Sequence, residues 1–356
     1  MSDEFDLDVL AESFSEFLEG EWPKEKAIAY ERSDQSYDAD LWSAMAGLGW
    51  TALTAPEAEG GLGLGTAAAA HLHAALGAAV TPTPMLGTLL ATTLLGATGA
   101  EGARGLLAGI IDGSLRVAVA EPNAVPVQTD GKTISGTARD LLDAPGANLL
   151  LVRIALAGQP GWVAIDADAP GVSIHRYTLA DTTRSLGDVT LDNVQIGEGR
   201  LIRPTAGAAL DDLLTRQACV AIAADSLGGG EAVLKITIEY MKVREQFGRL
   251  IGSFQALKHR VADHHAALVG ARELVLNAAT IPDDDDGALL AALSTKAHVA
   301  AVTADIARDC IQLHGGVGFT SEFSPHLYLK RAKLNEALYG TRTAILDRVA
   351  DMLEAA

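Results

Sequence analysis

Two short stretches in the last third of the sequence combine residue types that suit nucleotide binding. The first, VREQFG, contains Arg244, Gln246 and Phe247. A planar guanidinium matches a pyrophosphate, an amide can hydrogen-bond a ribose or a base edge, and a phenyl ring can stack. The same stretch also fits a basic helix end that complements the helix dipole, so both interpretations stay open on these residues alone.

The second stretch, QLHGGVGF, contains Gln312, Gly315 and Gly316. Glycines have no side chain, so a ligand can come close to the backbone at these positions. A glycine also ends many helices, and taken alone this pair favours that simpler interpretation.

Long segments with helical apolar spacing must position both stretches. They cover about 205–245, 254–280, 286–314 and 323–354, which predicts an antiparallel four-helix bundle. Arg244 then lies at the end of the first helix, the second helix begins near Ser253, and the glycines follow the third. The two stretches are thus expected at helix ends, where loops carry function.

The chain as a whole follows the order helices, strands, helices. Residues 1–113 read as an N-terminal helical domain, residues 114–200 as a middle β domain, and residues 201–356 as the C-terminal bundle. Six β-type runs separated by Gly, Pro, Asp and Asn predict a small barrel or sandwich. The expected fold class is α+β.

Composition restricts the partners and the compartment. A formal charge of −19 argues against nucleic acid and against an anionic membrane surface. The two cysteines, Cys219 and Cys310, fall in helical segments, which favours a reducing compartment. The start of the sequence lacks the pattern of a signal peptide, and no uncharged apolar run reaches the length of a membrane span. We therefore expect a cytoplasmic protein.

Four other motifs have plain structural interpretations. The aspartates at 283–286 are expected in a solvated turn before a helix, and His264 with His265 on a helix surface. The GLGLG run at 61–65 follows no strand, so it fails the context test for a dinucleotide fingerprint. The GGG run at 228–230 predicts close packing between helices.

Together with LWSAMAGLGWTALTAPEAEGGLGLG and VAVAEP, the two stretches resemble the acyl-CoA dehydrogenase family over nearly the whole chain. The resemblance implies FAD and the removal of the α and β hydrogens of an acyl-CoA thioester. A glutamate takes the α proton in that family, the flavin N5 receives the β hydride, and an electron-transfer flavoprotein reoxidises the flavin.

The resemblance also implies that each FAD lies across a dimer interface. One subunit gives the β domain and the flavin-ring pocket, and the other gives the arginine-containing turn and the Gln-Gly-Gly turn. The expected cofactor-binding residues of this chain are Arg244, Gln246, Phe247, Gln255, Gln312, Gly315 and Gly316.

The sequence departs from the family where the base should be. The residue before Gly340-Thr341 is Tyr339, where the family carries its glutamate. Some relatives use a position on the first long C-terminal helix, which falls here on Ala218. Glu336 is displaced from Tyr339 by about 5 Å, one helical turn. A phenol with a pKa near 10 is a poor base at neutral pH, so Tyr339 is interpreted as a packing residue.

The expected flavin-ring pocket departs as well. Glu121-Pro122 are kept, but the glycines and the Gly-Ser-Asp that follow in the family are missing. Asp140, Leu141 and Leu142 stand where the family has Trp-Ile-Thr. A leucine has no hydroxyl, and Asp140 introduces a carboxylate where a flat apolar face is expected.

This pattern resembles the smaller, non-catalytic chains of heteromeric acyl-CoA dehydrogenases of bacterial steroid side-chain catabolism. It predicts an α2β2 assembly with a catalytic partner subunit and one FAD per heterodimer, acting on an acyl-CoA that no residue here identifies. Two alternatives stay open: an active homo-oligomeric flavoprotein with an atypical base, and a flavin-free scaffold subunit.

Overall fold

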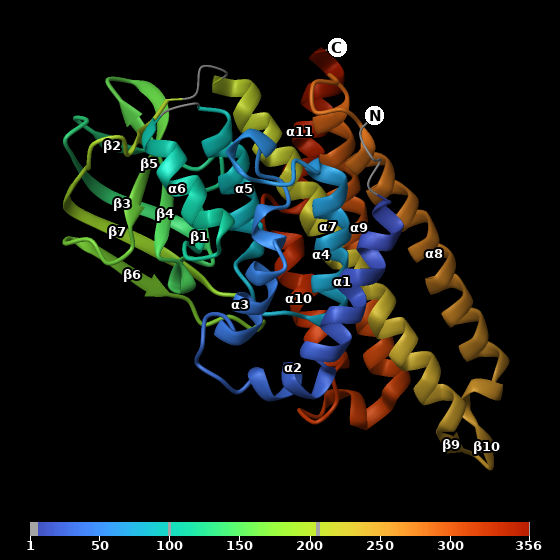
Figure 1. Cartoon of the computed structure of the whole chain (residues 1–356). Coiled ribbons are helices and arrows are strands. Elements are labelled where there is room, and N and C mark those ends of the chain that lie inside the picture. The colour runs from blue at the N-terminus through green and yellow to red at the C-terminus, as the bar shows by residue number, and fades with distance from the viewer. Residues whose placement is uncertain (1–5, 99–100, 204–206, 356) are drawn as a thin grey trace. The chain divides into compact units, whose positions relative to one another are not determined.

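The computed structural model describes residues 6–98, 101–203 and 207–355, and Figure 1 shows the whole chain. Its elements follow the order helices, a β-sheet region, then helices, as the sequence predicts. Contacts group the chain into two units, each assembled from separate segments. The first unit contains residues 1–33, 66–81 and 219–356, and the second contains residues 34–65 and 82–218. Domain boundaries near 113 and 200 stay a prediction.

Helices make up most of the first unit. They are α1 (Leu7–Glu21), α2 (Lys24–Tyr30), α4 (Gly65–Ala79), α7 (Gly207–Val243), α8 (Gln255–Thr280), α9 (Ala288–His314), α10 (Pro325–Ala337) and α11 (Arg342–Ala355). The first parts of α4 and α7 belong to the second unit. Between α7 and α8 lies a short hairpin, β9 (Glu245–Gln246) and β10 (Arg249–Leu250), followed by the 3-10 turn η4 (Ile251–Ser253). A second 3-10 turn, η5 (Gly315–Phe319), follows α9.

The second unit combines short helices with a sheet. Its helices are α3 (Ala39–Gly47), α5 (Met85–Gly96) and α6 (Glu101–Ile111), with 3-10 turns η1 (Trp50–Ala52), η2 (Glu57–Glu59) and η3 (Ala144–Gly146). Its strands are β1 (Val117–Val119), β2 (Val127–Thr129), β3 (Thr133–Leu142), β4 (Leu149–Leu156), β5 (Gln159–Asp166), β6 (Val172–Arg176), β7 (Leu186–Gln195) and β8 (Leu201–Ile202).

The eight strands form one hydrogen-bonded sheet in the order β6-β7-β3-β2-β4-β5-β8. Strand β1 pairs with β4 in parallel, as does β2, and the other pairs are antiparallel. All six predicted runs are strands. The two that the sequence did not indicate, β2 and β8, are 3 and 2 residues long, too short for an alternating pattern to be recognised.

The C-terminal helices follow the prediction except at the last one. The segment expected as one helix over 323–354 is two helices, α10 and α11. Tyr339 and Gly340 separate them with φ angles of 54° and 102°. A helix cannot continue through left-handed backbone, so the apolar spacing on both sides of the break was wrongly read as continuous.

The predicted close packing of the 228–230 glycines is confirmed within the first unit. A Cβ added to Gly228 of α7 would lie 1.9 Å from the backbone oxygen of Ala74 in α4. The contact is reciprocal, because a Cβ on Gly77 of α4 would lie 2.0 Å from the backbone oxygen of Asp225. The two helices therefore touch backbone to backbone, and neither glycine has room for a side chain.

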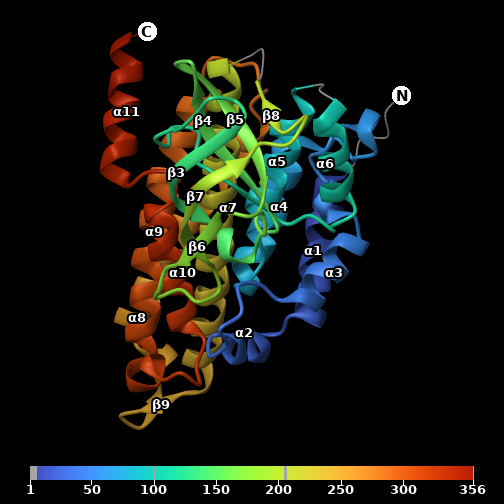
Figure 2. The same cartoon turned by 90° about the vertical axis from the view of Figure 1, so that its left-hand side faces the viewer.

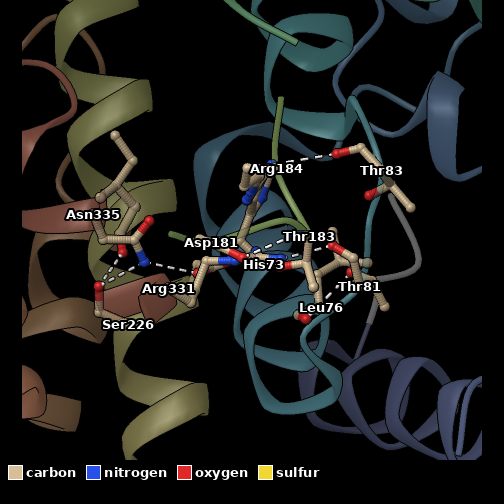
Figure 3. Close-up of polar contacts among 12 residues, drawn as sticks. His73, Leu76, Thr81, Thr83, Asp181, Thr183, Arg184, Ser226, Arg331 and Asn335 are labelled. Carbon is tan, nitrogen blue, oxygen red and sulfur yellow. Dashed lines mark hydrogen bonds and ion pairs between the residues drawn. The ribbon is translucent and has the colours of Figure 1, made fainter. Parts of the chain in front are cut away.

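A buried polar cluster joins α10 to α7 in the same unit. Arg331 donates to Asp225 at 3.0 Å and to the carbonyl of Thr81 at 2.8 Å. Asn335 donates to the other Asp225 oxygen at 2.8 Å and to Ser226 at 3.0 Å. Figure 3 shows Asn335 turned toward Ser226, and the Arg331, Asp225 and Asn335 side chains are all at most 2% exposed. These bonds fix the position of α10 against α7, and with it the start of the link between α10 and α11.

Helix α9 is the core of the bundle. By length and composition alone, Ala288–Phe319 is apolar enough to cross a membrane, with a mean hydropathy of 1.2. In this structure 56% of that apolar window is buried, which is how a central helix of a bundle lies.

Candidate functional site

A groove of about 770 Å³ lies at the end of the first unit where α7, α8 and α9 carry the nucleotide-type stretches. In Figures 1 and 2 the β9–β10 hairpin is at the tip of the α7–α8 pair. The groove is lined by Tyr240, Arg244, Gln246, Phe247, Ile251, Phe254, Ala256, Leu257, Arg260, Gln312, Leu313, His314, Gly315, Gly316, Val317 and Thr320. Six of the seven predicted cofactor-binding residues are among them.

The arginine stretch forms the turn between α7 and α8. The amide of Arg244 still bonds to the Tyr240 carbonyl at 2.9 Å, and its own carbonyl accepts from Ile251 at 2.8 Å. Phe247 and Gly248 turn the chain with φ angles of 54° and 75°. The hairpin leaves Arg244 exposed and Phe247 93% exposed. The ring of Phe247 is therefore accessible to solvent at the tip of the turn.

The base of the hairpin is well anchored. Met241, Ile251 and Leu313 form a buried cluster that ties it to the end of α9. Phe254 lies edge-on to Phe247, with ring centroids 6.3 Å apart. The Arg249 guanidinium lies 3.9 Å from the Phe254 ring centroid, a cation–π contact. The exposed tip is therefore carried on a fixed base.

The glycine turn is open on its groove side. Gly315 has a φ of 65°, and a Cβ added to Gly315 or to Gly316 would meet nothing within 4 Å. Packing therefore requires neither glycine, unlike Gly228, but the backbone of Gly315, with φ 65° and ψ −145°, has a conformation that favours glycine. The preceding His314 is stacked on Tyr240, with centroids 4.5 Å apart, and burial lowers its pKa. That stack fixes the turn against α7.

The charge of the groove differs from that of the chain. Arg244 and Arg260 line it, and among the described residues no lining side chain is a carboxylate. In a chain with a formal charge of −19, such a surface favours an anion such as a phosphate. The seventh predicted residue, Gln255, is the exposed first residue of α8 and does not line the groove.

The link between α10 and α11 carries the residue at the expected base position. Tyr339 is 8% exposed, which fits a packed side chain. The buried Lys296 of α9 donates to the carbonyl of Glu336 at 3.1 Å and to that of Gly340 at 2.5 Å. A cation that holds the last carbonyls of a helix stabilises its end. The link between α10 and α11 is thus held by Lys296, which lies 43 positions before Tyr339 in the sequence.

The other two base positions also lack a suitable carboxylate. Ala218 is a fully buried alanine inside α7. The Glu336 side chain pairs with Lys333 at 2.6 Å and is 28% exposed. A carboxylate held by a neighbouring lysine on the same helix is a surface ion pair.

In the second unit, Asp140 lies on a bulge of β3. The register of β3 against β7 shifts between Ala138 and Leu141, and Asp140 has a φ of 56°. Its amide donates to Asp188 at 3.1 Å, and the Tyr177 hydroxyl donates to the same Asp188 oxygen at 2.6 Å. The hydrogen bond raises the pKa of Tyr177 and lowers the pKa of Asp188. Asp140 is thus held at an exposed position of the bulge.

Metal chemistry finds no support in the described part of the chain, where no cluster of His, Cys, Asp and Glu is arranged to hold an ion. The aspartates at 283–286 are exposed in the turn before α9, as predicted. His264 bonds to Asp309 at 2.7 Å on the outside of α8 and α9, and His265 is exposed.

Comparison with known proteins decides the family. The model of the acyl-CoA dehydrogenase C-terminal domain matches residues 215–353, and that of the N-terminal domain matches residues 6–113. The acyl-CoA dehydrogenase IpdE2 of Mycobacterium tuberculosis is 32% identical over 89% of this chain and 87% of its own length. IpdE2 of Mycolicibacterium smegmatis is also 32% identical, over 96% of both chains.

The chain belongs to the acyl-CoA dehydrogenase family. Two solved structures of such enzymes match almost all of this acyl-CoA dehydrogenase family member. A variant of the Tcur3481-Tcur3483 steroid ACAD is 31% identical, with a TM-score of 0.88 over 98% of both chains. The ChsE4-ChsE5 complex from Mycobacterium tuberculosis is 26% identical, with a TM-score of 0.88 over 98% of this chain and 97% of that one. The family consists of FAD-binding oxidoreductases.

Three features of this acyl-CoA dehydrogenase family member escaped sequence reasoning. Lys296 reads as one lysine in an apolar helix, and nothing in its spacing indicates the link that it holds. The Arg331–Asp225 pair joins residues 106 positions apart, with no local signal. Arg260 follows the arginine stretch by 16 positions in the sequence, where helical spacing from Leu257 could have placed it on the groove side of α8.

Proposed function

We propose that this chain is the non-catalytic subunit of a heteromeric, FAD-dependent acyl-CoA dehydrogenase. It contributes one side of a FAD site that lies across the interface with a catalytic subunit, in an α2β2 assembly with one FAD per heterodimer. It has no base of its own. We propose a cytoplasmic location, an acyl-CoA thioester as the substrate of the complex, and an electron-transfer flavoprotein as its oxidant.

One observation carries this proposal: the groove keeps the residue types expected to bind an anion, whereas neither expected base position holds a carboxylate. Arg244, Gln312 and the open glycine turn line one groove with no carboxylate among its described lining residues. Neither Tyr339 nor Ala218 carries a carboxylate that could take the α proton of a substrate. A scaffold that never meets a cofactor would have no physical need for this groove.

The groove fits the diphosphate part of a dinucleotide. Arginines supply forked donors, the amide of Gln312 can bond a sugar or a base, and the glycines let a ligand approach the backbone. When FAD is bound, it supplies the acceptor for the hydride. In this proposal the chain's own residues bind and orient it, and the exposed ring of Phe247 covers it from water.

The second unit fits a flavin ring poorly. Asp140 presents a carboxylate on its bulge, and Leu142 lacks the hydroxyl that the family's threonine has at this position. Asp188 adds a second carboxylate that Tyr177 keeps charged by its hydrogen bond. An oxidised flavin ring is flat and largely apolar, so the exposed carboxylate of Asp140 is a poor neighbour for it. We therefore propose that this chain does not seat a flavin ring of its own.

The names of two related structures support a two-component assembly. Tcur3481-Tcur3483 and ChsE4-ChsE5 are each named as a pair of chains, and they match this chain at 31% and 26% identity. The first is a steroid ACAD by name. On that similarity, a steroid side-chain CoA thioester is the substrate class that we propose to test first.

The test is the flavin content of the purified chain, alone and together with its catalytic partner. We expect little FAD and no dehydrogenation of acyl-CoA thioesters from the chain alone, and one FAD per heterodimer with activity in the complex. One FAD per chain in an active homo-oligomer would establish the first alternative. An active complex whose FAD affinity is unchanged by every groove substitution would establish the scaffold.

A further inference from the structure

A second arginine lies on the groove wall in an arrangement that the nucleotide stretches do not include. Arg260 of α8 donates through Nε to Asp309 of α9 at 3.1 Å, and its Nη2 donates to the other carboxylate oxygen. His264, one turn further along α8, bonds to Asp309 at 2.7 Å. The same Arg260 lines the groove with Arg244 and Gln312.

The carboxylate orients Arg260 without using all of its donors. A guanidinium has five N–H groups in a fixed plane, and the Asp309 pair occupies one on Nε and one on Nη2. Three N–H groups remain, and the side chain is 40% exposed. An arginine held by a carboxylate loses less side-chain freedom when it binds a phosphate, because its position is already set.

The charge state of this cluster is settled by its hydrogen bonds. Burial alone would raise the pKa of Asp309, but the bonds from Arg260 and His264 outweigh it and hold the pKa below its ordinary value. Asp309 therefore stays ionised at neutral pH and keeps Arg260 in place. The Asp309 oxygens accept hydrogen bonds from residues of α8, and Asp309 is not among the residues that line the groove.

We propose that Arg260, positioned by Asp309, is a second phosphate-binding residue of the groove and contacts the diphosphate of FAD together with Arg244. This inference rests on the proposed function. A diphosphate has two phosphoryl groups, and two guanidiniums on the wall of one groove match them better than one. Asp309 is the positioning residue, since it acts on the cofactor through Arg260.

The competing explanation is that Arg260 only joins α8 to α9. The two explanations predict different changes in FAD affinity for one substitution. Asp309→Asn keeps an oxygen that can still accept a hydrogen bond from Arg260, so the orientation of Arg260 is largely kept while a negative charge close to it is removed. If Arg260 binds phosphate, Asp309→Asn leaves the FAD affinity unchanged or strengthens it, because Arg260 loses its compensating charge. If Arg260 only joins the helices, Asp309→Asn and Arg260→Ala weaken the same ion pair between α8 and α9, and FAD binding falls in both variants.

The experiment measures the Kd for FAD of the deflavinated complex with the catalytic subunit, by flavin fluorescence. Arg260→Ala should raise Kd about tenfold, as expected for a lost charge-assisted contact. The matched control is Arg272→Ala. Arg272 is also on α8 and pairs with Glu231 at 2.6 Å, away from the groove. Its loss should change Kd by less than about twofold. Thermal unfolding of each variant reports any loss of structure.

Arg244→Ala, measured alongside, separates this inference from the proposed function. If Arg244→Ala weakened FAD binding and Arg260→Ala left it unchanged, the proposed role of Arg260 would be overturned and the proposed function would stand. Equal weakening by Arg260→Ala and Asp309→Asn would also overturn it. If neither arginine variant weakened FAD binding, the proposed function itself would fail. Weakening by Arg260→Ala with unchanged or tighter binding by Asp309→Asn is the supporting result.

Discussion

The groove at the ends of α7, α8 and α9 and the bulge on β3 differ in the charge of their side chains. The groove lines its wall with Arg244 and Arg260, and no described lining residue is a carboxylate. The bulge carries Asp140 beside Asp188, whose charge is stabilised by Tyr177. This difference supports our proposal that the groove binds the cofactor of the complex, and that the bulge, with its internal hydrogen bonds, does not seat a flavin ring.

The same contrast separates two kinds of glycine. Gly228 and Gly77 are needed because helices touch there, whereas Gly315 and Gly316 stand in open space. Gly315 is still required by its φ of 65°. Gly316 is required neither by packing nor by a positive φ, so a ligand beside the cationic side chains explains it better than the fold does. The glycines can therefore be used to test structure and binding separately.

The largest effect is expected from substituting the two kinds of glycine. Gly228→Ala would place a methyl group 1.9 Å from the Ala74 backbone oxygen, so α4 and α7 must separate. We expect at least about 3 kcal/mol of destabilisation, or failure to fold. Gly316→Ala has room and should leave thermal unfolding unchanged while weakening FAD binding in the complex. A destabilised Gly316→Ala with normal FAD binding would contradict the distinction.

Arg244→Ala tests the groove directly. Loss of a charge-assisted contact costs roughly 1.5–3 kcal/mol, so the FAD affinity of the complex should fall about tenfold to a hundredfold. The assembly and its melting temperature should persist, because Arg244 is exposed and the bundle core is untouched. Flavin titration with size-exclusion chromatography checks both. Unaltered flavin affinity would remove the main support for a cofactor role.

Tyr177→Phe tests the bulge and should affect stability alone. It removes the hydroxyl that donates to Asp188 at 2.6 Å, at a cost of about 1 kcal/mol in the free energy of unfolding. FAD affinity in the complex should be unchanged. Chemical denaturation of parent and variant at neutral pH measures the difference.

The pH dependence of that difference follows from the two pKa shifts. The pKa of Asp188 is lowered in the fold, so its contribution is present above the unfolded value near 4 and is lost as pH falls through the lower folded value. The pKa of Tyr177 is raised, so its contribution is present below about 10. The parent–variant gap should be constant from about pH 6 to 8 and shrink in acid. If the difference in free energy of unfolding between parent and variant stayed the same below the folded pKa of Asp188, the bond would not be charge-assisted.

The smallest effect on activity is expected for Tyr339→Glu, which restores the family's base at the link. We expect no acyl-CoA dehydrogenation from the chain alone, because a base acts only on a substrate already positioned against a flavin. Burying a carboxylate at a position only 8% exposed should also lower the melting temperature. Tyr339→Gln controls for the change of shape. Turnover with added FAD and an artificial acceptor would show that the chain's own flavin site is intact.

The sequence predicted most of the fold because the relevant signals are local. Helical spacing placed α7, α8 and α9 within about two residues of their observed ends, and alternating runs placed six strands. Short elements and the break at Tyr339 were missed, since two or three residues have no periodicity and a tyrosine rarely adopts positive φ.

The candidate site was predictable to the extent that its residues are consecutive in sequence. VREQFG and QLHGGVGF are recognised in the sequence as two stretches, and the structure adds that nine of their residues line one groove. Gln255 is also predicted to bind the cofactor, but it is exposed at the start of α8 and does not line the groove. The side of a helix that a residue faces near its start depends on the residue at which the helix begins. A sequence pattern places that residue only to within one or two positions.

By itself the sequence determined the order of elements, the absence of a carboxylate at Tyr339 and Ala218, and the residue types that can bind a phosphate. The tertiary structure alone decided that Arg260 joins Arg244 on one wall, that Lys296 holds the link at Gly340, and that Asp140 is fixed by Asp188. These contacts connect residues 16 to 48 positions apart. They depend on how helices and strands pack, and packing brings together side chains between which the sequence carries no local pattern.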